Sequence, residues 1–162
     1  MIEMQVGGLG FDPRNLSPLV LLRDQEELNF LPIWIGIFEA AAIAMELQNV
    51  KPPRPMTHDL LVELIKKLGA SMQRVVINDV KEGTFYATID IEKDKKMFKL
   101  DARPSDAIAL AVRTHAPIFV SEVVMMQAKL VNAEKDEEET KKFKDFIQNM
   151  KPEDFTKYYK KD

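Results

Sequence analysis

Short apolar runs separated by polar turns occupy the first 35 residues. Residues 1–11, 18–22 and 30–35 are mainly apolar or small, whereas 12–15 and 24–29 are polar and turn-forming. Apolar runs of this length, bounded by turn residues, are typical of β-strands. The pattern therefore predicts three strands, and we expect the second and third to form a hairpin.

The period changes from strand-like to helical at Gly36. Residues 37–48 (IFEAAAIAMELQ) are helix formers and are apolar on nearly every side, which predicts a helix that is buried or packs against two partners. The segment 50–55 contains three prolines and cannot continue that helix. A second helix is expected over 59–68, with Thr57 as its cap and Gly69 as its stop.

The second half repeats the order of strands followed by a helix. Residues 71–79 and 84–92 alternate cleanly and predict a hairpin, and a short strand is expected at 97–100. A helix over 105–114, a strand over 117–120 and a helix over 121–130 follow. This order predicts an α+β fold, in which a mixed, largely antiparallel sheet packs with about three main helices.

The end of the chain has a different character. We expect a domain over residues 1–130 and a short, charged, helical C-terminal appendage over 131–162, with helices near 141–150 and 152–159. The side chains expected to pack this appendage are Phe143, Phe146, Ile147 and Phe155.

A weak internal repeat relates the two Ala-rich helices. At an offset of 67 residues, EAAAIAM (39–45) aligns with DAIALAV (106–112), and each segment follows a predicted strand. Ala-rich helices also produce such matches by chance. A true duplication would place Glu39 and Asp106 at equivalent positions in the first turns of two helices.

Composition excludes several kinds of chemistry. The 162 residues include no Cys and two His, which rules out disulfides, thiolate catalysis and Cys-based or His-rich metal sites. The lack of Cys fits a cytoplasmic protein. No stretch resembles a signal peptide or a membrane span, so we expect no membrane partner. The formal net charge of −3 is not that of a strongly basic nucleic-acid binder.

Charged residues gather at the predicted helix starts. A helix N-terminus attracts anions, and an adjacent arginine can add a bidentate phosphate contact. Carboxylates nearby could hold Mg²⁺ or Mn²⁺, and histidine can carry protons near neutral pH. The sequence thus suggests His58, Asp59 and Asp106 as catalytic residues, Arg54 and Arg103 as phosphate-binding residues, and Glu39, Asp59, Asp101 and Asp106 as metal ligands.

Structural roles explain the same residues. An acid in the first turn of a helix is favoured by the helix dipole, and the arginines can form ordinary ion pairs with these acids. Trp34 is expected in the core. The sequence contains no phosphate-binding glycine loop, HExxH zinc motif or GxSxG nucleophile motif that would decide between the two interpretations.

Four ordered segments resemble the bifunctional nuclease family. They are LPIWIGIFEAAAIAMEL (31–47), RPMTHDLL (54–61), GTFYA (83–87) and DARPSDAIALAVR (101–113). The resemblance covers about residues 1–130 and implies cleavage of RNA and DNA.

Two functions follow as expectations. The first is a nuclease that hydrolyses phosphodiester bonds of RNA or DNA with help from a divalent metal. The second is a non-enzymatic module that binds a small ligand or forms oligomers. A homo-oligomer is expected from the apolar helix over 37–47 and the aromatic residues near the C-terminus.

Overall fold

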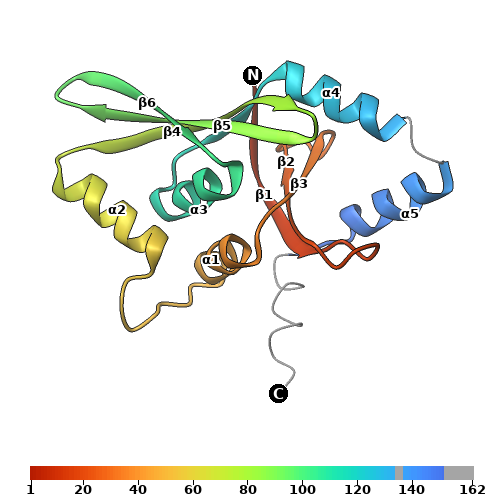
Figure 1. Ribbon diagram of the computed structural model, residues 1–162, viewed down its shortest axis with the longest axis horizontal. Helices are drawn as coiled ribbons and strands as arrows, with labels where there is room; N and C mark the ends of the chain where they lie inside the picture. The colour runs from red at the N-terminus through yellow and green to blue at the C-terminus, as the bar shows by residue number, and fades with distance from the viewer. Residues whose placement is uncertain (134–136, 152–162) are drawn as a thin grey trace.

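The structure, a computed structural model, describes residues 1–133 and 137–151 (Figure 1). It confirms the predicted α+β fold. The strands are β1 (Ile2–Phe11), β2 (Pro18–Arg23), β3 (Phe30–Trp34), β4 (Ser71–Lys81), β5 (Thr84–Lys93), β6 (Lys96–Ala102) and β7 (Ile118–Val120). The helices are α1 (Ile37–Leu47), α2 (Thr57–Lys67), α3 (Pro104–Thr114), α4 (Glu122–Ala133) and α5 (Glu137–Gln148).

The strands form one mixed sheet in the order β3-β2-β1-β7-β4-β5-β6. Among the described strands, β4 and β7 pair in parallel, and the other neighbours pair antiparallel. The hairpin predicted between the second and third strands is present as β2–β3. The short strand β7 joins two antiparallel meanders, β1–β2–β3 and β4–β5–β6.

The offset of 67 residues extends well beyond the two helices. Shifting α1 (Ile37–Leu47) by 67 gives the bounds of α3 (Pro104–Thr114), and shifted β2 and β3 fall within β5 and β6. Shifted β1 and α2 overlap β4 and α4. Apart from β7, which lies between α3 and α4, the two halves of the described chain have the same element order, and the equivalence of Glu39 and Asp106 extends from the sequence to the fold.

The core lies between the sheet and the helices that follow the two meanders. Figure 1 shows α1, α2 and α3 on one side of the β4–β6 layer, with α4 and α5 toward the other end of the molecule. Ile43 of α1, Ile77 of β4 and Ile108 of α3 are fully buried in this core. Each such side chain contributes roughly 1.5–3 kcal/mol through burial. By contrast, Phe38 of α1 is 84% exposed, so this helix is not buried on every side. Of the two predicted alternatives, packing against two partners is the one observed, and the partners are α3 and β2.

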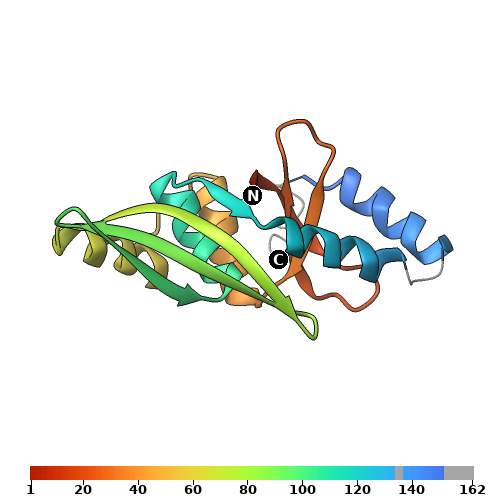
Figure 2. The ribbon, with the colours of Figure 1, turned by 90° about the horizontal axis from the view of Figure 1, so that it is seen from above.

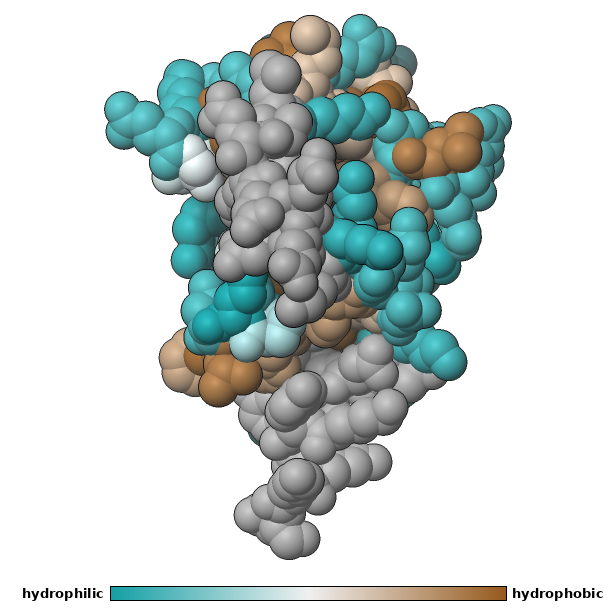
Figure 3. Space-filling model, turned by 90° about the vertical axis from the view of Figure 1, so that its right-hand side faces the viewer, coloured by the Kyte–Doolittle hydropathy of each residue, from teal (hydrophilic) through white to brown (hydrophobic). Residues whose placement is uncertain are grey.

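Helix α5 covers the other face of the first meander. Ile147 and Met150 are buried against Leu19 and Leu21 of β2, and Phe146 packs beside them. The packing predicted for Phe146 and Ile147 is thus confirmed. Phe155 and the Phe143 side chain lie outside the described residues. The face seen at this end of the molecule is mainly hydrophilic, with scattered apolar patches (Figure 3).

The expected boundary at residue 130 falls inside α4. Trp34 is 38% exposed and lies outside the core, because it follows the buried stretch of β3 and its indole N–H donates to Asp12 at 3.0 Å. In the described ranges, no helix is both long enough and apolar enough to cross a membrane.

Candidate phosphate site at three helix starts

Three helices begin close together, and each carries an acid at its third position. Gly36, Met56 and Arg103 are the N-cap residues of α1, α2 and α3, which places Glu39, Asp59 and Asp106 at equivalent positions. An acid in the first turn is stabilised by the positive end of the helix dipole. The local sequence therefore explains the acids, and the packing of the helices decides which of them meet.

Arg103 joins the starts of α1 and α3. Its Nη2 lies 2.6 Å from Glu39 Oε1 and 2.8 Å from Asp106 Oδ2, and its Nε donates to Asp106 Oδ2 at 3.0 Å. Hydrogen bonds to Glu39 and to Asp106 raise the pKa of the Arg103 guanidinium above its ordinary value. The Arg103 side chain is still 66% exposed. A cation fixed between two acids is thus open to solvent.

His58 adds the start of α2 to the same group. Its Nε2 lies 2.9 Å from Asp106 Oδ1, and the residue is 8% exposed. The two oxygens of Asp106 are therefore bound by different partners, Oδ1 by His58 and Oδ2 by Arg103. We call Glu39, His58, Arg103 and Asp106 the helix-start cluster.

Gly36 gives the Glu39 carboxylate the room it needs in this cluster. A Cβ atom on residue 36 would collide with Glu39 Oε2. The backbone of Gly36 is extended, with φ −72° and ψ 154°, so the glycine is needed for space and not for its torsion angles. The equivalent position in the second unit is Arg103.

Asp59 faces a different partner, which the sequence reasoning missed. Asp59 Oδ1 accepts from Arg113 Nε at 2.8 Å, and the other groups of Arg113 donate to the Ala42 and Ala109 carbonyls. Burial alone would raise the pKa of Asp59, but hydrogen bonds from Arg113 and from the Met56 backbone N–H lower it. Arg113 follows Asp106 by seven residues on the same face of α3. This spacing is the sequence signal that could have predicted that Arg113 lies near the same acids.

Arg54 and Asp101 do not join the cluster. Both are exposed, and within the described part of the chain neither side chain takes part in a hydrogen bond or ion pair. Asp101 belongs to β6 and lies opposite Thr88, whereas its neighbours Leu100 and Ala102 lie opposite buried residues of β5. Because side chains alternate along a strand, Asp101 points to the face away from the helices.

The arrangement fits an anion better than a divalent cation. The described residues contain no group of three or more His, Asp or Glu side chains that could hold a metal ion. Arg103 lies between Glu39 and Asp106, where a metal shared by these two acids would have to bind. The four predicted metal ligands therefore do not form one set, and a need for Mg²⁺ or Mn²⁺ stays a prediction.

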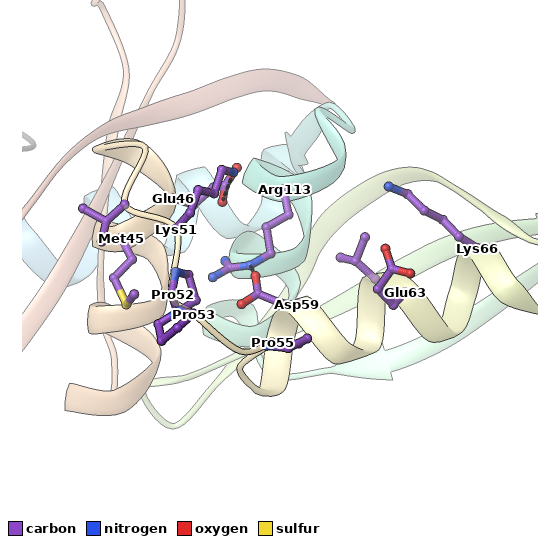
Figure 4. A pocket seen from close by; sticks show the side chains of 12 residues that line it. Met45, Glu46, Lys51, Pro52, Pro53, Pro55, Asp59, Glu63, Lys66 and Arg113 are labelled. Carbon is purple, nitrogen blue, oxygen red and sulfur yellow. Dashed lines mark hydrogen bonds and ion pairs between the residues drawn. The ribbon is translucent and has the colours of Figure 1, made fainter.

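A pocket of about 420 Å³ lies beside the cluster, with the Asp59–Arg113 ion pair in its wall. Figure 4 shows these two side chains pointing toward each other between the proline segment and α2. Pro52, Pro53 and Met45 give the pocket an apolar side. Asp59 directly follows His58, so the pocket and the cluster share the first turn of α2.

Comparison with known proteins gives consistent matches. Residues 20–133 match the bifunctional nuclease domain. An uncharacterized protein of Mycobacterium tuberculosis is 45% identical over 96% of this chain and 98% of its own length. Bifunctional nuclease 2 of Oryza sativa subsp. japonica is 30% identical over 64% of this chain, and bifunctional nuclease 1 of Oryza sativa subsp. indica is 28% identical over 56%. These matches cover 33% and 28% of the two plant proteins.

Proposed function

The chain belongs to the bifunctional nuclease domain family, and from this premise we propose that it hydrolyses phosphodiester bonds of RNA, DNA or both. Two plant relatives are named bifunctional nucleases, and the mycobacterial relative is uncharacterized. The observation that supports a hydrolytic site in this chain is the helix-start cluster. We expect the protein to act in the cytoplasm, since the chain lacks cysteine.

We propose that Arg103 binds the phosphate. Its Nη1 makes no hydrogen bond with the described residues, whereas Nε and Nη2 are held by Asp106 and Glu39. A guanidinium held on one side and exposed on the other can donate to a phosphate oxygen without losing its own supports. The N-termini of α1 and α3 add a field that favours an anion at the same place.

We propose that His58 moves the proton. The hydrogen bond between Nε2 and Asp106 Oδ1, at 2.9 Å, holds the ring in one orientation, and histidine is the side chain that most often transfers protons near neutral pH. Asp59 was predicted to be catalytic, but its position supports a positioning role, since its ion pair with Arg113 holds the first turn of α2 in which His58 lies. Arg54 is exposed near the same turn and stays a predicted phosphate contact.

Two observations favour the alternative, a non-enzymatic module that binds an anionic ligand. Glu39, Asp59 and Asp106 are each engaged by an arginine or a histidine, as in a purely structural network. The net charge of −3 also gives little attraction for a polyanion over long distances. In this alternative, Arg103 binds a phosphate group and no bond is cleaved.

A nuclease assay with matched variants separates the two functions. Wild-type, Arg103→Ala, Asp106→Asn and Lys67→Ala proteins would be purified in parallel and incubated with single-stranded RNA and DNA. Lys67 is an exposed cation of α2 outside the cluster, so it controls for the loss of positive charge. We expect the cluster variants to cleave about 100-fold more slowly than wild type and Lys67→Ala to match it.

Two other outcomes would contradict the nuclease proposal. Equal cleavage by all four proteins would identify a contaminating nuclease and overturn the proposed site. Binding of a phosphodiester without cleavage, weakened by Arg103→Ala, would favour the binding module. A parallel series with a chelator tests the Mg²⁺ or Mn²⁺ prediction independently of the residue assignments.

A further inference from the structure

The sheet has an open edge at β6. The opposite edge strand, β3, is short and contains Pro32, whereas β6 (Lys96–Ala102) is a seven-residue strand without proline. Unpaired backbone groups along such an edge can pair with another strand. Figure 2 shows β6 along the free margin of the β4–β6 layer.

The turn before β6 determines which backbone groups point outward. Lys93 pairs with Lys96 across a two-residue loop, and both loop residues, Asp94 and Lys95, have positive φ. In such a hairpin the residues that flank the loop are hydrogen-bonded to each other, and the bonding alternates along the strand. The N–H and C=O groups of Met97, Lys99 and Asp101 therefore point away from β5.

Apolar side chains are uncovered at this edge. Phe98 and Leu100 lie opposite Ile91 and Ile89, which are buried on the helix side of the sheet. Directly opposed residues share a face, so Phe98 and Leu100 extend the core to the margin. They are nevertheless 50% and 47% exposed. A partner strand beside β6 would cover them.

The charges of β6 are complementary to those of a second copy of β6. Suppose two copies run antiparallel with Leu100 opposite the partner's Leu100. Lys99 then lies opposite the partner's Asp101, and Asp101 lies opposite the partner's Lys99. Both residues have outward-pointing backbone groups, so this register also pairs the free donors and acceptors. A register shifted by two residues along one copy instead places the two Lys99 side chains opposite each other, which is repulsive.

We propose that the protein forms a two-fold symmetric dimer through antiparallel pairing of β6, with Leu100 at the symmetry axis. The two sheets become continuous across the interface, and Phe98 and Leu100 of both copies become covered. Asp101, which has no partner among the described residues, pairs with the partner's Lys99. This interface is independent of the proposed nuclease activity.

Single cysteines test the register directly, because the natural chain contains none. Residues at position 100 would face each other as a non-hydrogen-bonded pair, with Cα atoms about 4.5 Å apart, within disulfide range. We expect Leu100→Cys to form a disulfide-linked dimer under mild oxidation. The matched variant Phe98→Cys should not, since its two sulfur-bearing residues would be four positions, roughly 13 Å, apart.

Charge reversal tests the interface without a thiol. Asp101→Lys would place positive charges opposite each other twice per dimer, and we expect the dimer dissociation constant to rise about tenfold or more. Glu82→Lys makes the same change in charge in the β4–β5 turn and should leave the dimer unchanged. Light scattering after size-exclusion chromatography and sedimentation equilibrium measure the dimer dissociation constant of each variant. Circular dichroism checks that each variant is folded.

Three results would overturn the proposal. They are a wild-type protein that is monomeric at every concentration, a dimer that Asp101→Lys does not weaken, and faster cross-linking of Phe98→Cys than of Leu100→Cys. The last result would place the two-fold axis at a different residue.

Discussion

The Nε2 atom of His58 lies 2.9 Å from Oδ1 of Asp106, although 48 residues separate them along the chain. This bond links the first turn of α2 to the first turn of α3. It also leaves Arg103 to bind the other oxygen of Asp106. One carboxylate thus connects a nearly buried histidine to an exposed guanidinium.

Replacing His58 should have an effect on the free energy of unfolding and an effect on kcat that can be measured separately. We expect His58→Asn and Asp106→Asn each to lower the free energy of unfolding, with a coupling of about 1–2 kcal/mol in a double-mutant cycle followed by urea denaturation. If His58 carries the proton, His58→Asn should also lower kcat about 100-fold and remove one limb of the pH–rate profile. A loss of stability with an unchanged profile would reduce His58 to a structural role.

The ion pair between Asp59 and Arg113 should matter mainly for folding. The Arg113 side chain is 7% exposed, so Asp59→Asn leaves a nearly buried charge without its carboxylate. We expect the free energy of unfolding to fall by about 2–4 kcal/mol. Glu63→Gln, an exposed change in the same helix, should alter it by less than about 0.5 kcal/mol. Equal effects of the two substitutions in urea denaturation would contradict this role.

Acid should destabilise the protein partly through Asp90. Burial would raise the pKa of this carboxyl, but hydrogen bonds from Arg74 at 2.6 Å and Lys99 at 3.0 Å lower it. The charged form is therefore favoured in the folded state, and its contribution is fully present above the ordinary Asp pKa of about 4. The contribution disappears as the pH falls through the lowered value.

This linkage gives Asp90→Asn a pH-dependent cost. The difference in unfolding free energy between wild type and Asp90→Asn should be about 2–3 kcal/mol at neutral pH and should shrink below about pH 4. Urea denaturation at a series of pH values measures it. A difference that is constant with pH would mean that the carboxylate charge is not what stabilises this part of the sheet.

Gly36→Ala should act on the cluster without unfolding the protein. The backbone angles of Gly36 suit alanine, and alanine also reduces the entropy of the unfolded chain, so we expect stability to stay within about 1 kcal/mol of wild type. The new methyl group must displace the Glu39 carboxylate. Phosphate binding and cleavage should therefore change in the same direction as in Glu39→Gln. Fluorescence titration with a short oligonucleotide compares the two variants.

Much of the fold follows from local patterns. The change from short apolar runs to an Ala-rich helical stretch at Gly36 located α1, and the clean alternation of residues 71–92 located the β4–β5 hairpin. These signals are strong because each is a property of neighbouring residues. The match between the segments at 39–45 and 106–112 also pointed correctly to two acids at equivalent helix positions.

The site was less predictable because it depends on how distant elements pack. The sequence predicted a strand that ended at Leu100, but β6 continues to Ala102, and the two-residue period then turns Asp101 to the face away from the helices. In the folded chain His58 of α2 meets Asp106, whereas Asp59 meets Arg113. The seven-residue spacing places Asp106 and Arg113 on one face of α3, but it does not show which residue of α2 meets which of them.

The two halves with similar element order differ at the N-cap position of their Ala-rich helices. The N-cap residue of α3 is Arg103, whereas the N-cap residue of α1 is Gly36. The starts of these two helices therefore share one guanidinium group. Two acids, one from each half, thus converge on one positive group. If Arg103 binds phosphate as proposed, the stoichiometry is one phosphate per chain, and the proposed dimer would carry two.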